Sequence, residues 1–303
     1  MDLAVLEEIR ACLGDERTVF YYFRDRYAAL LLEMAVGEGR SVQDLRRSPF
    51  AGLLNKPSVR TWLSRLGKSR IERRDVEHLW ENPALAYRMT LGRWPLEGRG
   101  WSKDYHQMTR RGHNLVLQLN FPISHNRALF SLVGREDAEG EVCRSHPAAE
   151  DEMTLAWARL DIEMETGEAL IEEIQSDWIR DVQFNAGIGR VLDRYRPWIR
   201  YADGPMQPYV RTWPETMLSA ALWFLYHEMK VRRVFYHTYE SGMRLKHLDD
   251  SQPPRSLYTE LPRRFCFRRT HNGPLFLRDS KYRTMRKRLS EPKTDWFVLE
   301  LPA

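Results

Sequence analysis

The sequence has few cysteines and no long apolar run, and these absences exclude several classes of protein. Its 303 residues include only three cysteines, Cys12, Cys143 and Cys266, which are far apart in the chain. This number and spacing argue against a disulfide framework and against a cysteine-based zinc site. No apolar run reaches the roughly 20 residues that span a bilayer, and the acidic first residues lack the basic-then-apolar order of a signal peptide. We therefore expect a cytoplasmic protein with no membrane contact.

Several motifs of common chemistries are also missing. No Gly-rich loop leads into a Lys-Ser/Thr pair, so the chain has no P-loop, and Gly187-Ile188-Gly189 lacks the third glycine of a dinucleotide fingerprint. No Gly-x-Ser-x-Gly elbow is present. The histidines do not occur at the paired spacings of zinc sites, so we do not expect zinc.

A basic segment near the end of the chain is the clearest charge feature. The net charge is only +5, but residues 263–288 carry ten basic residues against one acid, Asp279. The basic residues are Arg263, Arg264, Arg268, Arg269, Arg278, Lys281, Arg283, Arg286, Lys287 and Arg288. Clustered arginines attract phosphates and other anions. A solvated surface without a partner is the alternative, and the sequence leaves both open.

Hydrophobic periodicity predicts an α+β fold. Apolar residues at three- and four-residue spacing predict a helix over residues 19–36, and Pro57 is well placed to open another. Strand signals begin only after residue 113, where Asn114 to Phe121 alternates apolar and polar side chains. We therefore expect a helical region over residues 1–95 and an α+β domain over 96–303. In that domain a mainly antiparallel sheet packs against a long helix.

The sequence also predicts the elements that follow the helical region. They are a connector over 95–112, a strand over 114–121, a partner strand over 128–133, a hairpin over 155–175, a helix over 215–230 opened by Pro214, a strand over 233–238 and a final strand over 296–301. Gly167 supplies the positive φ that the hairpin turn needs.

The second arm of the hairpin carries an unusual row of polar residues. Side chains alternate between the two faces of a strand. On a regular strand, Glu173, Gln175 and Asp177 therefore share the face that begins with Ala169 and Ile171. Two carboxylates and a carboxamide in line are candidate catalytic groups.

The first arm of the hairpin offers two partners for this row. Arg159 would neutralise a carboxylate in an ion pair, which favours a purely structural polar strand end, with Arg180 or Arg190 as further partners. Asp161 would instead join Glu173 in a carboxylate cluster that binds a divalent cation such as Mg²⁺. Asp161 followed by Glu173-Ile174-Gln175 has the order of residues found in metal-dependent nucleases. The residues leave both alternatives open.

His237 is a second candidate catalytic group. It ends a predicted strand and is followed by Thr238 and Glu240. Strand ends are common places for functional sites, and a histidine there can act as a general base. A hydrogen-bonded structural histidine is the alternative. Further candidate substrate-binding residues are Arg159, Trp178, Trp213, Glu215, Thr238, Glu240, Arg268 and Arg269.

The run Leu-Ile-Glu-Glu-Ile-Gln-Ser-Asp-Trp at residues 170–178 resembles the signature of an uncharacterised domain in very large phage and prophage polyvalent proteins. Looser landmarks follow in the same order. They are Ala158-Arg159, Thr212-Trp213-Pro214-Glu215 with Leu218, the strand Val234 to Glu240, and Tyr258-Thr259-Glu260-Leu261-Pro262. The resemblance covers residues 155–301, about half of the chain. It implies a link to mobile elements and to proteins that act on nucleic acid or in host defence, but no known reaction.

The chain also departs from that signature. Ile179-Arg180 stands where the phage proteins have His-Gln, and Trp157 replaces a histidine of the preceding strand. Any chemistry that depends on those histidines is absent here.

Three functions remain open. The first is an enzyme that acts on nucleic acid or a nucleotide, with the polar strand as its site, a divalent cation as cofactor and the basic segment as phosphate-binding surface. The second is a non-catalytic binding or adaptor protein of a mobile element or defence system. The third is a transferase that holds a nucleotide-like cosubstrate between Trp178, Trp213 and His237. The sequence predicts no oligomeric state.

Overall fold

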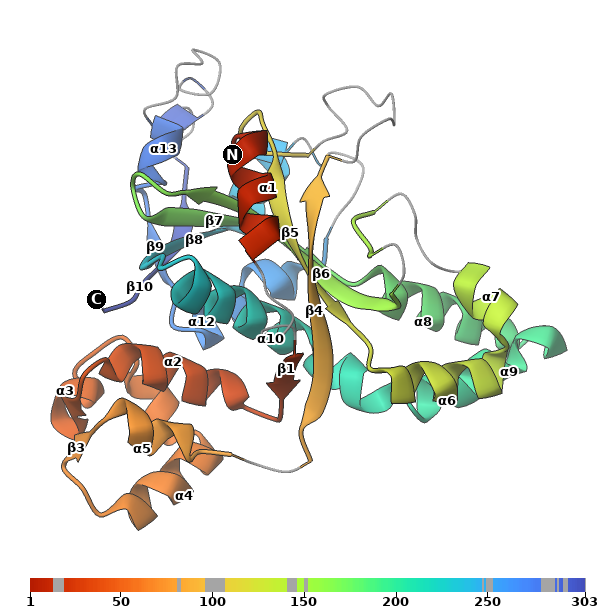
Figure 1. Cartoon of the computed structure of the whole chain (residues 1–303), viewed down its shortest axis with the longest axis horizontal. Coiled ribbons are helices and arrows are strands. Elements are labelled where there is room, and N and C mark those ends of the chain that lie inside the picture. Colours follow the sequence, from red (N-terminus) through yellow and green to blue (C-terminus); the bar gives the residue numbers. More distant parts are fainter. Residues whose placement is uncertain are drawn as a thin grey trace.

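A mixed sheet of eight strands organises the chain (Figure 1). The structure is a computed structural model, and it describes residues 1–12, 19–80, 83–95, 107–140, 146–149, 152–246, 248, 253–278, 287, 289–290 and 294–302. In spatial order the strands are β1 (Val19–Tyr22), β4 (Leu85–Trp94), β5 (Asn114–Asn120), β6 (Thr154–Glu163), β7 (Glu168–Gln175), β8 (Arg233–His237), β10 (Trp296–Glu300) and β9 (Arg268–Thr270). Every neighbouring pair is antiparallel except β7 and β8. The predicted α+β fold with a mainly antiparallel sheet is confirmed.

The central hairpin forms as its sequence predicts. β6 and β7 pair over almost their full lengths, and Gly167 in the turn has a φ of 63°. Glycine adopts this left-handed backbone without steric strain, because it has no Cβ. The strands predicted over 114–121, 233–238 and 296–301 correspond to β5, β8 and β10. Most of the predicted connector, 96–106, lies outside the described residues.

The first 95 residues contribute strands as well as helices. Between β1 and β4 lies a group of four helices, gathered at one end of the molecule in Figure 1. They are α2 (Arg26–Val36), α3 (Val42–Arg46), α4 (Pro57–Leu66) and α5 (Arg73–Glu77), with the short strands β2 (Arg40–Ser41) and β3 (Arg70–Ile71).

The single helix predicted over residues 19–36 is wrong. Burial alternates along Val19–Tyr22, which is the pattern of a strand at the rim of a sheet. Asp25 then takes a left-handed φ of 61° and separates this strand from α2.

A second group of helices lies at the other end of the sheet (Figure 1). It comprises α6 (Ile123–Val133), α7 (Arg135–Gly140), α8 (Asp177–Gly189) and α9 (Arg196–Asp203). The strand predicted over 128–133 is wrong, because this segment is the second half of α6. The buried residues of α6 are His125, Leu129 and Val133, and a spacing of four places them on one helical face.

The long helix α10 (Gln207–Trp223) crosses the sheet and packs against β6 and β7. The predicted start at Pro214 is wrong, because Pro208 stands in the first turn and Pro214 lies inside the helix. A proline inside a helix costs about 3 kcal/mol. Tyr209, upstream of Pro214, is buried against Phe121 and Tyr87, and this packing offsets the cost.

The remaining helices are α1 (Leu3–Cys12), α11 (Tyr239–Lys246), α12 (Glu260–Arg264) and α13 (Leu275–Arg278). α11 follows β8 directly, so its first turn lies at the end of that strand. None of the helices within the described ranges has the length and apolar character needed to cross a membrane.

A substitution in the buried core tests the fold directly. Leu117, on the central strand β5, has none of its surface exposed, whereas Val191 is 83% exposed. Leu117→Ala should lower the free energy of unfolding by about 2–5 kcal/mol, because it leaves a cavity in a packed core. Urea unfolding followed by circular dichroism measures this loss. Val191→Ala is the control and should change stability by less than about 0.5 kcal/mol; equal effects of the two substitutions would contradict the placement of β5.

Candidate functional site

A bulge in β7 determines where the polar residues of the hairpin point. Arg159 pairs with Glu173 and Leu160 pairs with Ile171, so Glu172 has no partner on β6. The extra residue breaks the alternation of side chains, and Ala169, Ile171 and Ile174 all join the main core. Glu173 therefore lies on the face opposite Ala169 and Ile171, and the predicted common face is wrong.

Glu172 accepts hydrogen bonds from two segments that are distant in the sequence. The backbone nitrogen of Thr109 lies 3.0 Å from its Oε1, and the Thr109 hydroxyl lies 2.7 Å from its Oε2. His237 Nε2 is 3.1 Å from Oε2. Glu172 and His237 have no exposed surface. Burial alone would raise the pKa of Glu172, but His237 and the nearby cations lower it to about 2, so the group is ionised.

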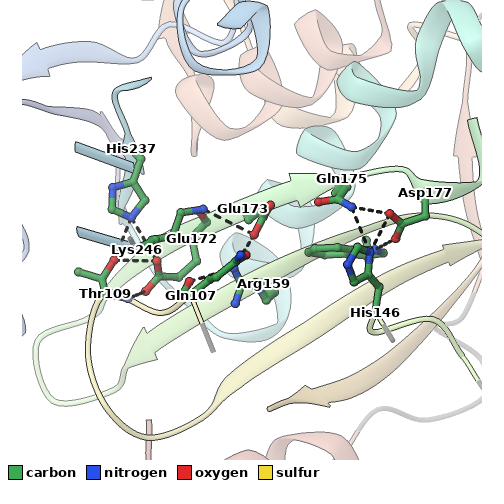
Figure 2. Close-up of polar contacts among 11 residues, drawn as sticks. Gln107, Thr109, His146, Arg159, Glu172, Glu173, Gln175, Asp177, His237 and Lys246 are labelled. Carbon is green, nitrogen blue, oxygen red and sulfur yellow. Dashed lines mark hydrogen bonds and ion pairs between the residues drawn. The ribbon is translucent and has the colours of Figure 1, made fainter. Parts of the chain in front are cut away.

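Glu173 lies in an adjacent cluster with two cations. Arg159 donates to its carboxylate, and Lys246 Nζ lies 3.5 Å from Oε2 (Figure 2). Lys246, at the end of α11, is fully buried and also donates to the carbonyl oxygen of Glu172 over 3.0 Å. Burial opposes ionisation of Glu173, yet Lys246 and Arg159 hold its pKa below the ordinary value. The carboxylate is thus ionised and paired.

Gln175 and Asp177 belong to a separate cluster at the end of β7 (Figure 2). Asp177 is the first residue of α8, not part of the strand. It accepts from Trp157 Nε1 over 3.0 Å, lies 2.8 Å from His146 Nδ1, and also accepts from Gln175. Arg180 Nη2 lies 2.5 Å from Asp177 Oδ1. The predicted catalytic row is therefore divided into two groups that are both largely buried.

Asp161 lies in a third ion pair, apart from Glu173. It is fully buried and receives two bonds from Arg110, at 2.7 and 2.9 Å, and one from the backbone nitrogen of Met1 at 3.1 Å. Across the hairpin it faces Leu170, whereas Arg159 faces Glu173. Within the described part of the chain, no group of three or more His, Cys, Asp or Glu side chains is placed to hold a metal ion.

A hollow of about 310 Å³ opens where β8 ends and α11 begins. It is lined by Thr238, Glu240, Ser241, Arg244, Arg269, Thr294 and Asp295. Three of these residues, Thr238, Glu240 and Arg269, are predicted from the sequence as substrate-binding. Ser241 is not predicted, although its position four residues after His237, at the start of a helix, is a signal that sequence reasoning can use. The remaining three carry no recognisable signal.

Charges of both signs meet in this hollow. Arg269 lies 3.7 Å from Glu240, and both side chains are more than half exposed. Arg244 donates to the hydroxyl of Thr294, and Asp295 is paired with His271. The lining thus contains two guanidinium groups and two carboxylates, together with three hydroxyls that have partners within the protein.

The other predicted substrate-binding residues have structural partners. Arg268 is paired with Glu300. Glu215, on α10, accepts from Tyr22 over 3.1 Å and from Arg264. Trp178 lies in the main core with Trp213 packed against that core, whereas His237 is beside Trp296 of a second cluster. The structure thus does not bring Trp178, Trp213 and His237 around one pocket.

The pairing of Glu173 predicts its contribution to stability. Glu173→Gln keeps the shape of the side chain but leaves Arg159 and Lys246 without their carboxylate. We expect the free energy of unfolding to fall by about 3–5 kcal/mol, because uncompensated buried charges are costly. Urea unfolding near neutral pH measures it. Glu165→Gln, in the exposed hairpin turn, should have almost no effect. A loss below about 1 kcal/mol for Glu173→Gln would show that the ion pair is not formed.

The lowered pKa of Glu172 predicts how the stability of the protein changes in acid. Its pKa falls from 4.5 to about 2 on folding, so its contribution is complete above pH 4.5 and is lost as the pH falls towards 2. Glu172→Gln should therefore flatten the decline of stability with acidification. Urea midpoints measured at about pH 5, 4 and 3 test this, with Glu165→Gln expected to keep the wild-type slope. Identical slopes in all three proteins would refute it.

Comparison with known proteins does not assign the chain to a family. No protein-family model, curated protein or solved structure matches the chain. The resemblance of residues 155–301 to the phage and prophage domain stays a prediction that rests on the motif alone.

Proposed function

We propose that the protein is an enzyme that acts on a nucleotide, which it binds in the hollow at the end of β8. The observation that carries this proposal is the mixed lining of the hollow, where Arg244 and Arg269 stand with Glu240 and Asp295. Guanidinium groups bind phosphate oxygens. Carboxylates accept hydrogen bonds from hydroxyl and amino groups. A nucleotide presents all of these groups in one molecule.

The size of the hollow supports a small ligand. About 310 Å³ is at the lower end of the range of roughly 300–1,000 Å³ that is typical of ligand sites. This volume suits one nucleotide better than a nucleic-acid strand, which would need a long groove. Thr238, Ser241 and Thr294 also line the hollow, and their hydroxyls are bonded to protein groups.

The basic segment also favours a nucleotide over nucleic acid. Arg264 and Arg268 are each paired with a glutamate, Glu215 and Glu300 respectively. These pairs reduce the positive field that an extended phosphate backbone needs. Lys281, Arg283, Arg286 and Arg288 lie outside the described residues.

In this proposal the polar residues of β7 support the site and do not line it. Glu172 holds His237, and His237 is the residue immediately before Thr238 of the hollow. Glu173, Arg159 and Lys246 anchor α11, whose first turn forms one wall. Glu173 thus has a positioning role here, whereas Gln175, Asp177 and Asp161 belong to ion-pair clusters that do not line the hollow.

The second candidate is a non-catalytic binding or adaptor protein. One observation favours it: Glu173, Asp161 and Asp177 are all buried in ion pairs with protein groups. A network that is satisfied in this way specifies a structure without needing a ligand.

Nucleotide binding is tested directly by removing one guanidinium of the hollow. Arg269→Ala should weaken mononucleotide binding roughly 10- to 100-fold, because a hydrogen bond to a charged group contributes about 1.5–3 kcal/mol. Isothermal titration calorimetry with the four common ribonucleoside monophosphates measures the change, with inorganic phosphate and ribose as partial ligands. Arg263→Ala is the matched control, since Arg263 is exposed and does not line the hollow.

The outcomes separate the two candidates. Binding of a mononucleotide that is lost in Arg269→Ala and kept in Arg263→Ala supports the proposed site. Absence of binding of all four mononucleotides at millimolar concentration would refute it and favour the adaptor. Equal loss in both variants would place binding on the general basic surface.

A further inference from the structure

A row of hydrogen bonds leads from the hollow into the sheet. Ser241 Oγ lies 3.0 Å from His237 Nδ1, and His237 Nε2 lies 3.1 Å from Glu172 Oε2. Ser241 lines the hollow, whereas His237 and Glu172 are completely buried behind it. A hydroxyl, an imidazole and a carboxylate in this order are the parts of an activated nucleophile.

The partners of His237 determine which ring nitrogen carries the proton. An ionised carboxylate only accepts hydrogen bonds, so Nε2, which faces Glu172, must be the donor. Thr109 Oγ1 lies 3.0 Å from the same nitrogen and gives its own proton to Glu172, so it too can only accept from Nε2. Burial lowers the pKa of His237, and the ring is therefore neutral. Nδ1 is left as an acceptor for the Ser241 hydroxyl.

The backbone holds Ser241 in place. Its amide donates to the Thr238 hydroxyl over 3.1 Å, as in an N-terminal helix cap, and Thr238 Oγ1 in turn donates to the carbonyl oxygen of Asp295 over 3.2 Å. The Ser241 hydroxyl also lies 3.2 Å from the carbonyl oxygen of Thr238. A bond to a carbonyl oxygen one turn earlier is common for serine in a helix, but here it is longer than the contact with His237 Nδ1.

We infer that Ser241 is a nucleophile towards phosphorus, with His237 as its general base and Glu172 as the residue that positions the imidazole. This inference rests on the proposed function and adds the reacting group to it. Arg244 and Arg269 line the same hollow and can balance the charge that develops on the phosphoryl oxygens.

The covalent step balances without a further reactant. Ser241 Oγ attacks the phosphorus of a phosphate ester or anhydride, and a new O–P bond forms as the bond to the leaving oxygen breaks. The leaving oxygen keeps the electron pair, and the hydroxyl proton passes to His237 Nδ1 and then to that oxygen. Water then attacks the phosphoserine with His237 again as base, which releases phosphate or a phosphomonoester and restores the Ser241 hydroxyl.

An alkyl fluorophosphonate tests the inference on the intact protein. Ser241 would attack its phosphorus, fluoride would leave with the electron pair, and a stable adduct would remain. Peptide mapping by mass spectrometry identifies the labelled residue in the wild-type chain, so the result does not depend on a variant that folds. We expect labelling at Ser241 to be at least about 100-fold faster than at other serines, which is the usual effect of a positioned base.

Ser131 is the matched control, because its hydroxyl donates to the carbonyl oxygen three residues earlier, over 2.9 Å, and it lies exposed on a helix. Ser241→Ala should abolish fast labelling, and Ser131→Ala should leave it unchanged. Failure of the folded wild-type protein to label at Ser241, or equal labelling at Ser131, overturns the inference. If calorimetry shows mononucleotide binding but Ser241 is not labelled, the proposed binding site stands and only the role of Ser241 as a nucleophile is refuted. If Ser241 is labelled fast and no mononucleotide slows the labelling, the result supports Ser241 as a nucleophile and counts against a nucleotide as the ligand of the hollow.

Discussion

The buried charge of Lys246 is the constraint on which the polar centre of the molecule depends. β8 pairs with β7 only as far as Ile171, and the Lys246 ammonium donates to the carbonyl oxygen of the next residue, Glu172. A buried charge is tolerated only when it is paired. Lys246 and Arg159 balance Glu172 and Glu173, while His237 stays neutral. The two cations and two carboxylates therefore cancel, and removing any one of them leaves a net charge away from water.

The same balance connects the sheet to the hollow. α11 begins at the hollow and ends at Lys246, so the ion pairs that hold Lys246 also fix the first turn of the helix. Glu172 orients the imidazole of His237 from the other side. Thr238, Glu240, Ser241 and Arg244 of the hollow thus stand on a strand end and a helix that are both anchored in the core, and rigid supports of this kind give a site its precision.

The sequence predicts the parts of this arrangement that local rules control. Alternation and Gly167 predict the hairpin, and the strand ending in His237 follows from its apolar residues. The bulge at Glu172 is not visible in the sequence, because residues 168–175 are compatible with a regular strand and only their pairing with β6 reveals the extra residue. Lys246 carries no signal either, since a lysine on a short helix ordinarily faces water. Pro208 and Pro214 both have the position of a helix start, and only the burial of Tyr209 decides between them.

The parallel pairing of β7 with β8 has a consequence for the order of folding. The segment 176–232, which contains α8, α9 and α10, separates the two strands. Contacts across such a separation form late, because a long loop must close first. The antiparallel strands β4 to β7 are closer in sequence and can assemble beforehand. Glu173 therefore meets Arg159 when the hairpin forms, whereas His237 and Lys246 reach Glu172 and Glu173 only in a later stage of folding. Glu172 would stay hydrated until β8 docks, so the hollow forms only as the fold is completed.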